Sequence, residues 1–296
     1  MAGHLLDAGH EMTVFDLRSE VVEDFAAKGA VPAGSPADVA AATELVFTSL
    51  PGPQDVEQVV FGPSGLAGGW REGSTYVDLS TNSPTVVRRI HARLLEQGVE
   101  MLDAPVSGGP SGAESRKLAI WAGGAEATFA RMRPVLEGFA DEPIYVGPIG
   151  AGSVAKLVHN CAGYVIQAGL AEVFTLGVKA GVDPLGLWQA VRKGALGRRC
   201  TFDSLADHFL PGDFDPAAFA LRLAHKDVSL ATALGREVGV PMRLGNLALE
   251  EMTEALNRGW GALDSRVAMV LQEERAGVNI AVPLEALRAA LAEDSR

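Results

Sequence analysis

The chain contains very little cysteine and fewer basic than acidic residues, and each shortage excludes a class of protein. Only Cys161 and Cys200 are present among 296 residues, so the chain is neither a disulfide scaffold nor a cysteine zinc site. The 25 basic residues against 37 acidic ones give a net charge of −12, which argues against nucleic acid and anionic membranes as partners. The first residues lack the cationic segment of a secretory signal. We therefore expect a cytoplasmic protein kept in a reducing compartment.

The sequence has one long stretch of low charge, which runs from about residue 150 to residue 180. Polar residues such as Lys156, Asn160 and Glu172 interrupt this stretch too often for a membrane span, so it predicts a buried helix. A helix that is apolar on all sides must be covered by its own domain or by another subunit. We therefore expect a homodimer or a homotetramer without membrane contact.

The pattern of apolar residues predicts two domains of different class. Before residue 149, short apolar runs alternate with helical patterns, which is typical of a parallel sheet covered on both faces. The predicted strands lie at 12–16, 45–49, 75–79, 99–103, 118–122 and 144–146, with helices at 1–9, 20–28, 54–61 and 84–97. After Gly152 the pattern is helical. We predict an α/β domain over residues 1–149, followed by an all-α domain over residues 150–296 that serves substrate binding and oligomerisation.

The beginning of the chain has an unusual order of elements for a nucleotide-binding sheet. Such a domain opens with a strand and a Gly-x-Gly-x-x-Gly turn, whereas residues 1–9 here resemble the helix that follows that turn. We expect the chain to begin late relative to its ancestor, without the first strand and the glycine loop. Asp16 ends the next strand, where such folds place a carboxylate for the ribose hydroxyls, so it favours NAD. Arg18 keeps NADP possible, because arginine pairs well with phosphate.

A lysine and an asparagine stand four residues apart at the start of the long apolar helix. Lys156 and Asn160 therefore leave the same helix face, one turn apart. Burial would lower the pKa of Lys156 toward the range of a general acid, although its stem could also pack while the ammonium reaches water. Asn160 could bond a substrate oxygen or bond across the domain interface. His159 is off this face and is more often packed or exposed than catalytic.

Three turns follow predicted strands, at the sheet edge where α/β proteins bind ligands. The Ser107-Gly108-Gly109 turn can direct backbone N–H groups and a hydroxyl at an anion, or it can be an ordinary strand exit. Leu50-Pro51 and Thr81 follow two other strands, where loop formation and helix capping are the alternative roles. No grouping of His, Asp and Glu has convincing metal spacing, so we expect no metal.

Taken in order, three motifs resemble the β-hydroxyacid dehydrogenase family, which includes 3-hydroxyisobutyrate dehydrogenase and tartronate semialdehyde reductase. The motifs are Asp103-Ala-Pro-Val-Ser-Gly-Gly, Gly150-x-Gly-x-x-x-Lys156-x-x-x-Asn160 and Lys226-Asp227. The resemblance runs from Met1 to about Gly245 and implies a Rossmann-like domain followed by an all-helical one.

The resemblance also implies the roles of individual residues. Lys156 matches the catalytic lysine. The residues that match substrate-binding positions are Ser107, Gly108, Gly109, Asn160 and Asp227. The residues that match or suit cofactor-binding positions are Asp16, Leu50, Pro51, Asp55, Thr81 and Lys226.

The expected reaction is reversible oxidation of a small anionic 3-hydroxy acid, with NAD or NADP as hydride acceptor. Lys156 would take the hydroxyl proton in oxidation and return it in reduction. Three alternatives stay open: an imine reductase, against which Lys156 speaks, a scaffold without cofactor affinity, and a sugar-phosphate dehydrogenase. The last would need phosphate-binding cations, for which Arg198 and Arg199 are the candidates. The sequence does not name the hydroxy acid.

Overall fold

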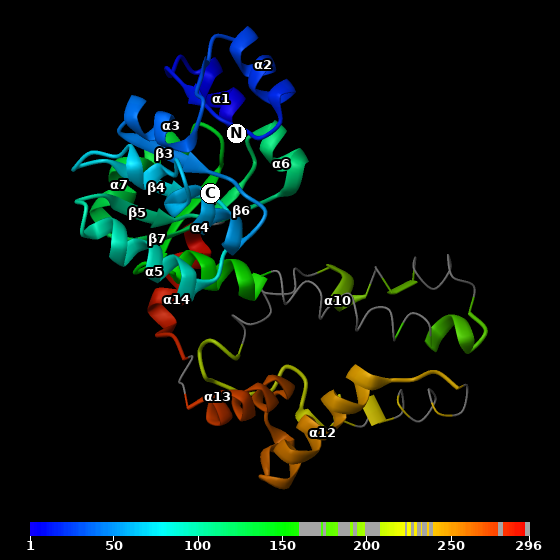
Figure 1. Cartoon of the computed structure of the whole chain (residues 1–296). Coiled ribbons are helices and arrows are strands. Elements are labelled where there is room, and N and C mark those ends of the chain that lie inside the picture. Colours follow the sequence, from blue (N-terminus) through cyan, green and yellow to red (C-terminus); the bar gives the residue numbers. More distant parts are fainter. Residues whose placement is uncertain are drawn as a thin grey trace. The chain divides into compact units, whose positions relative to one another are not determined.

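The structure is a computed structural model, and its chain divides into two compact units, Met1–Ala162 and Gly163–Arg296 (Figure 1). The described residues are 1–159, 173, 176–182, 190–191, 194–198, 208–222, 224–225, 228–229, 232, 236, 239–277 and 281–293. Each unit is described by itself below.

The first unit is built on a six-stranded sheet with the order β3-β4-β5-β7-β6, in which β8 also pairs with β7. The strands are β3 (Leu45–Thr48), β4 (Thr75–Asp78), β5 (Glu100–Asp103), β6 (Val106–Ser107), β7 (Ala119–Gly124) and β8 (Glu142–Gly147). Strands β3, β4 and β5 are parallel, as are β7 and β8, whereas β7 runs antiparallel to β5 and β6. The predicted fold class is confirmed, and the antiparallel turn-back at β7 is a feature that the apolar pattern does not contain.

A second, smaller sheet lies near the N-terminus. Strands β1 (Thr13–Val14) and β2 (Val31–Pro32) form a parallel pair of their own. Helix α1 (Ala2–Asp7) precedes β1 in the chain, and helix α2 (Ser19–Ala27) connects β1 to β2. The sequence indicated β1 and both helices but not β2, which is only two residues long and contains a proline.

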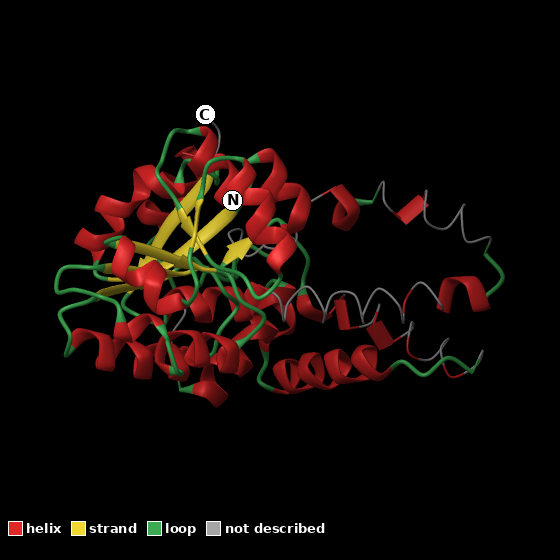
Figure 2. Ribbon diagram, turned by 45° about the horizontal axis from the view of Figure 1, so that its top comes forward, coloured by secondary structure: helices red, strands yellow, loops and turns green. Residues whose placement is uncertain are grey.

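Helices enclose the main sheet, as the alternating pattern predicts (Figure 2). Four of them have a proline in the first turn, where its fixed φ suits a helix and its missing N–H costs nothing. The helices are α3 (Pro36–Ala42), α4 (Pro53–Phe61), α5 (Pro84–Leu95), α6 (Gly109–Ser115) and α7 (Glu126–Leu136), with the 3₁₀ turn η1 (Leu66–Gly68).

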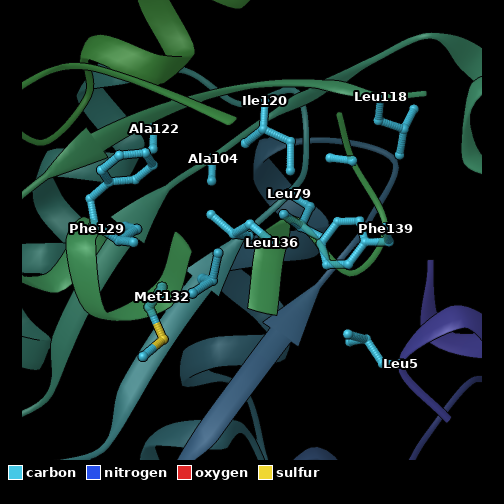
Figure 3. Close-up of a cluster of buried hydrophobic side chains, with 13 residues drawn as sticks. Leu5, Leu79, Ala104, Leu118, Ile120, Ala122, Phe129, Met132, Leu136 and Phe139 are labelled. Carbon is cyan, nitrogen blue, oxygen red and sulfur yellow. The ribbon is translucent and has the colours of Figure 1, made fainter. Parts of the chain in front are cut away.

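The sheet is apolar on both faces, because consecutive strand residues are buried hydrophobic ones and their side chains point to opposite sides. Val77, Leu102 and Ile120 belong to one buried cluster, which contains side chains of α7 (Figure 3). Tyr76 and Met101, one residue away along their strands, belong to a second cluster with side chains of α4 and α5. The strands are therefore held from both faces, and their carboxyl ends are fixed in place.

The regular elements described in the second unit are helices, as expected. They are α10 (Ala195–Arg198), α12 (Arg243–Asn257), η3 (Trp260–Ala262), η4 (Ser265–Met269), α13 (Val270–Ala276) and α14 (Leu284–Glu293). Leu221, Ala255, Val267 and Leu271 form its buried cluster. Within the part of the chain that the structure describes, every helix is too short or too polar to cross a lipid bilayer.

Candidate active site

A buried carboxylate at the end of β5 caps the helix that carries Lys156. Asp103 is 1% exposed, and its two oxygens accept the backbone N–H groups of Gly150 and Ser153, each at 2.7 Å. Burial raises the pKa of Asp103, and the two N–H groups oppose that rise by stabilising the ionised form. The first turn of a helix has N–H groups without partners and favours negative charge. Asp103 therefore attaches the helix at residues 151–159 to the centre of the sheet.

Two glycines allow this helix to approach the sheet closely. A Cβ on Gly152 would lie 2.2 Å from the carbonyl oxygen of Trp121 and 2.3 Å from that of Asp103. A Cβ on Gly123 would lie 2.5 Å from a carboxylate oxygen of Asp103. All three distances are shorter than van der Waals contact, so these two positions exclude any side chain. The Gly-x-Gly spacing at 150–152 is thus partly a packing requirement.

Lys156 lies one turn beyond the capped end of this helix and is 9% exposed. Burial lowers the pKa of its amine, since a charged ammonium is disfavoured away from water. Its Nζ lies 5.9 Å from the ring centroid of Trp121, within the range in which an aromatic face attracts a cation. The amine is therefore partly desolvated and has a defined neighbour.

The Ser107 turn contacts the same helix. Gly108 and Gly109 have φ values of +134° and +62°, a region that side chains avoid, so these residues turn the chain sharply after β6. The Oγ of Ser107 lies 3.3 Å from Nε2 of His159, and the imidazole of His159 packs on Trp121 with ring centroids 5.0 Å apart. We call Ser107, Trp121, Lys156 and His159 the Lys156 cluster.

A second buried carboxylate organises the loops after β3 and β4. Asp78 is 0% exposed and accepts bonds from Thr48 Oγ1, the Ser80 backbone and Asn82 Nδ2 at 2.9–3.1 Å. Ser80 Oγ in turn accepts the N–H of Leu50 at 2.9 Å. Burial is the main cause that raises the pKa of Asp78. These bonds bring the Leu50-Pro51 loop to the loop that contains Thr81.

Asp16 lies beside a pocket of about 340 Å³ at the end of β1. The pocket is lined by Phe15, Asp16, Leu17, Ser19, Val22, Glu23, Ala26, Pro32 and Ala33. Arg18 donates to the carboxylate from its backbone N–H at 2.9 Å and from Nε at 3.2 Å. These hydrogen bonds lower the pKa of Asp16, so the carboxylate stays ionised at the rim of the pocket.

The predicted site residues thus fall into three described groups. Ser107, Gly108 and Gly109 meet Lys156 through His159 and Trp121, and Leu50 and Pro51 meet Thr81 through Ser80. Asp16 stands at its own pocket, and Asp55 is exposed in the first turn of α4. Asn160, Lys226 and Asp227 lie outside the described residues, as do Arg199 and most of the long apolar helix.

Three residues that position the others were not predicted as site residues: Asp78, Asp103 and Trp121. Asp78 and Asp103 each end a buried apolar strand, in Thr-Tyr-Val-Asp and Glu-Met-Leu-Asp. A carboxylate in that position must find hydrogen-bond donors, and this was a signal the sequence did contain. Trp121 carried no signal, because nothing in a sequence says which ring will lie under a distant lysine.

Two family models match the chain. Residues 1–147 match the family described as the NAD binding domain of 6-phosphogluconate dehydrogenase. Residues 150–272 match the family described as NAD-binding of NADP-dependent 3-hydroxyisobutyrate dehydrogenase.

Individual relatives extend over nearly the whole chain. The chain is 35% identical to 2-(hydroxymethyl)glutarate dehydrogenase of Eubacterium barkeri, over 95% of this chain and 93% of that protein. The structure of Mycobacterium tuberculosis 3-hydroxyisobutyrate dehydrogenase with L-serine is similar at 32% identity and a TM-score of 0.62, covering 91% of this chain and 94% of that one. An imine reductase from Pseudomonas sp. has a TM-score of 0.73 but 19% identity, over 90% and 93% of the two chains, and so shares the fold alone.

The close approach at Gly152 predicts a large effect of one methyl group. Gly152→Ala should lower the free energy of unfolding by about 1–3 kcal/mol or more, because the added Cβ meets fixed backbone atoms. Gly3→Ala in α1 is the matched control, since a Cβ there meets nothing within 4 Å and alanine favours a helix by about 0.5–1 kcal/mol. Urea unfolding of both variants measures the difference. Equal midpoints would contradict the close approach.

The capping role of Asp103 predicts a graded loss of stability. Asp103→Ala leaves two buried N–H groups without an acceptor, at about 1–3 kcal/mol each, whereas Asp103→Asn retains one acceptor and should fall between. Because burial raises the folded-state pKa of Asp103, the folded protein binds this proton more tightly than the unfolded chain. The stability of wild type relative to Asp103→Asn should therefore fall as pH rises through that raised pKa. Urea titrations from about pH 4, close to the usual Asp pKa of about 3.9, up to about pH 7 measure this slope. An asparagine variant as unstable as the alanine variant would contradict the graded loss.

Proposed function

The chain belongs to the β-hydroxyacid dehydrogenase family of NAD(P)-dependent oxidoreductases, and we propose that Lys156 is the general acid and base for a small 3-hydroxy acid. The proposed reaction is reversible oxidation of that hydroxy acid to its aldehyde or ketone. The observation that supports it most is the desolvated amine of Lys156, held on a helix that a buried carboxylate attaches to the sheet. When bound, NAD or NADP supplies the hydride chemistry.

The proposed proton transfer follows from the state of the amine. In oxidation, neutral Lys156 Nζ accepts the proton of the substrate hydroxyl, and in reduction the ammonium donates a proton to the carbonyl oxygen. Burial lowers the pKa of Lys156, so more of the amine is neutral near neutral pH than for a lysine in water. The face of Trp121 favours the ammonium form and so limits that shift. Lys156 can therefore accept the proton in the oxidation and donate it in the reduction.

The acid group of the substrate requires hydrogen-bond donors close to this amine. The Ser107 hydroxyl and the backbone of Gly108 and Gly109 are exposed or half-buried at the turn after β6, and His159 connects this turn to the helix of Lys156. We assign the substrate carboxylate to these three residues. We assign Asn160 to the reacting hydroxyl of the substrate. Asp227 is proposed as a substrate-binding residue on the family resemblance alone.

The cofactor assignment rests on the chemistry of the donor and acceptor groups present. The Asp16 carboxylate is ionised beside a pocket with apolar walls, and this suits an adenosine whose ribose hydroxyls donate to it. Leu50, Pro51, Asp55 and Thr81 stand at or near the carboxyl ends of β3 and β4, where parallel sheets bind ligands. Lys226 keeps its assignment from the resemblance. Asp16 makes NAD the preferred cofactor in this proposal.

We also propose the roles of the two domains and the cellular location of the protein. Residues 1–149 form the dinucleotide-binding domain, and residues 150–296 supply further substrate contacts and the contacts of a homo-oligomer. The low cysteine content and the acidic charge support a cytoplasmic location.

Removing the amine tests the assignment of Lys156. Lys156→Ala should lower kcat for hydroxy-acid oxidation by about 10²–10⁴-fold, the usual contribution of general acid–base catalysis. The lowered pKa also predicts that wild-type kcat rises with pH around a midpoint below the usual lysine value of about 10.4, while the reduction rate falls across the same range. Assays of a panel of small 3-hydroxy acids with NAD and NADP measure both effects.

Lys28→Ala, at the exposed C-terminal end of α2, is the control for loss of a lysine. Near-normal turnover of Lys156→Ala with retained circular dichroism would refute the role of this amine.

The Asp16 pocket predicts a change of cofactor preference. Asp16→Ser removes the carboxylate that would repel a 2′-phosphate and releases Arg18 from its ion pair. The ratio of kcat/KM for NADP to that for NAD should rise by about tenfold, which corresponds to about 1.4 kcal/mol. Asp24→Ser makes the same charge change at an exposed position of α2 and should leave the ratio unaltered. Equal ratios in both variants would exclude Asp16 from the cofactor site.

A further inference from the structure

His159 is the member of the Lys156 cluster that the proposed mechanism leaves without a role. It stands three residues after Lys156 on the same helix and is exposed. Its Nε2 lies 3.3 Å from Ser107 Oγ, and its ring lies tilted by 46° on Trp121 at a centroid distance of 5.0 Å. The imidazole thus joins the turn assigned to the substrate carboxylate to the helix assigned to proton transfer.

The register of the sheet fixes Ser107 and Trp121 relative to each other. Ser107 pairs with Ala119 in the antiparallel ladder between β6 and β7, so both side chains leave the same face. Trp121 is two residues beyond Ala119 and projects from that face as well. The indole also lies under the Lys156 amine. A rigid strand therefore supports the imidazole from one side, which restricts where its Nε2 points.

The hydrogen bond between His159 and Ser107 has two possible directions, and only one of them suits a carboxylate ligand. A serine hydroxyl has one hydrogen to donate, and a neutral imidazole has one N–H. If Nε2 accepts the hydrogen bond, the Ser107 hydroxyl donates its one hydrogen to His159, and only the lone pairs of Oγ face the ligand. If Nε2 carries the hydrogen and donates, the Ser107 hydrogen is free to donate to a carboxylate oxygen.

We propose that His159 is a positioning residue which donates from Nε2 to Ser107 Oγ and so directs the serine hydroxyl hydrogen toward the acid group of the substrate. This inference rests on the proposed function, because it requires a carboxylate at Ser107. The acid group carries the same charge before and after hydride transfer, so the effect falls on substrate binding. His159 therefore selects for substrates with an acid group without taking part in the proton transfer.

The test separates binding from turnover. His159→Leu should raise KM for the hydroxy acid by about tenfold, the scale of a hydrogen bond to a charged group, and leave kcat within about twofold. KM for the cofactor should stay unchanged. His159→Gln, whose amide can donate in place of Nε2, should recover most of the loss. His10→Leu, an exposed histidine in the turn after α1, is the control.

A double-variant cycle tests whether His159 acts through Ser107. If it does, adding His159→Leu to Ser107→Ala should raise KM no further than Ser107→Ala does alone. Fully multiplicative effects, a fall in kcat equal to the rise in KM, or a glutamine variant no better than the leucine variant would each overturn the proposal.

A spectroscopic measurement keeps this inference distinct from the proposed function. The ¹⁵N chemical shift of His159 should show a protonated Nε2 in wild type, and Ser107→Ala should move that resonance. A wild type without activity on any hydroxy acid would remove the proposed function, whereas an active wild type with an unprotonated Nε2 would remove the role of His159 alone.

Discussion

The two hydrogen bonds that Asp103 accepts from the start of the helix at residues 151–159 determine where the amine of Lys156 lies. The carboxylate belongs to the central strand β5, and the capped N–H groups belong to residues 47 and 50 positions later in the chain. Its burial costs free energy, which the two N–H groups and the positive end of the helix offset. Gly123 and Gly152 permit the approach, since a Cβ on Gly123 would intrude between the carboxylate and the helix and a Cβ on Gly152 would collide with backbone carbonyls of the strands. The position of Lys156 is therefore a consequence of packing at the sheet.

A buried carboxylate at the end of a strand also occurs on the neighbouring strand β4, where it holds different segments of the chain. Asp78 and Asp103 face each other directly in the parallel register of β4 and β5, and both are buried. Asp103 holds a helix, whereas Asp78 holds two loops through Thr48, Ser80 and Asn82. Side by side, two carboxylates thus organise the edge of the sheet at which a substrate and a dinucleotide are proposed to bind. Neither needs to touch a ligand to be essential to the site.

Opposing requirements meet at the Lys156 cluster. A lysine that exchanges protons near neutral pH needs a lowered pKa, which burial provides, but it must also remain able to hold a proton for reduction. The indole of Trp121 lies near enough to favour the ammonium without the fixed charge of a carboxylate, which would raise the pKa much further. The same ring supports His159, so the proposed proton transfer and the proposed recognition of the acid group share one rigid neighbour.

Much of the architecture could be predicted from the sequence, because apolar periodicity reports burial directly. The alternation of strands and helices, the helical second half and the motif around Lys156 are local properties of the chain, and they identified the fold class, the family and the dinucleotide cofactor. The chain reversal that makes β7 antiparallel to β5 could not be predicted, nor could the hydrogen bonds that Asp103 accepts from Gly150 and Ser153. Those depend on which distant segments become neighbours. Tertiary structure alone decided that Trp121 lies beneath Lys156 and that His159 reaches Ser107, because a contact between a helix and a distant strand leaves no periodic signal in either segment.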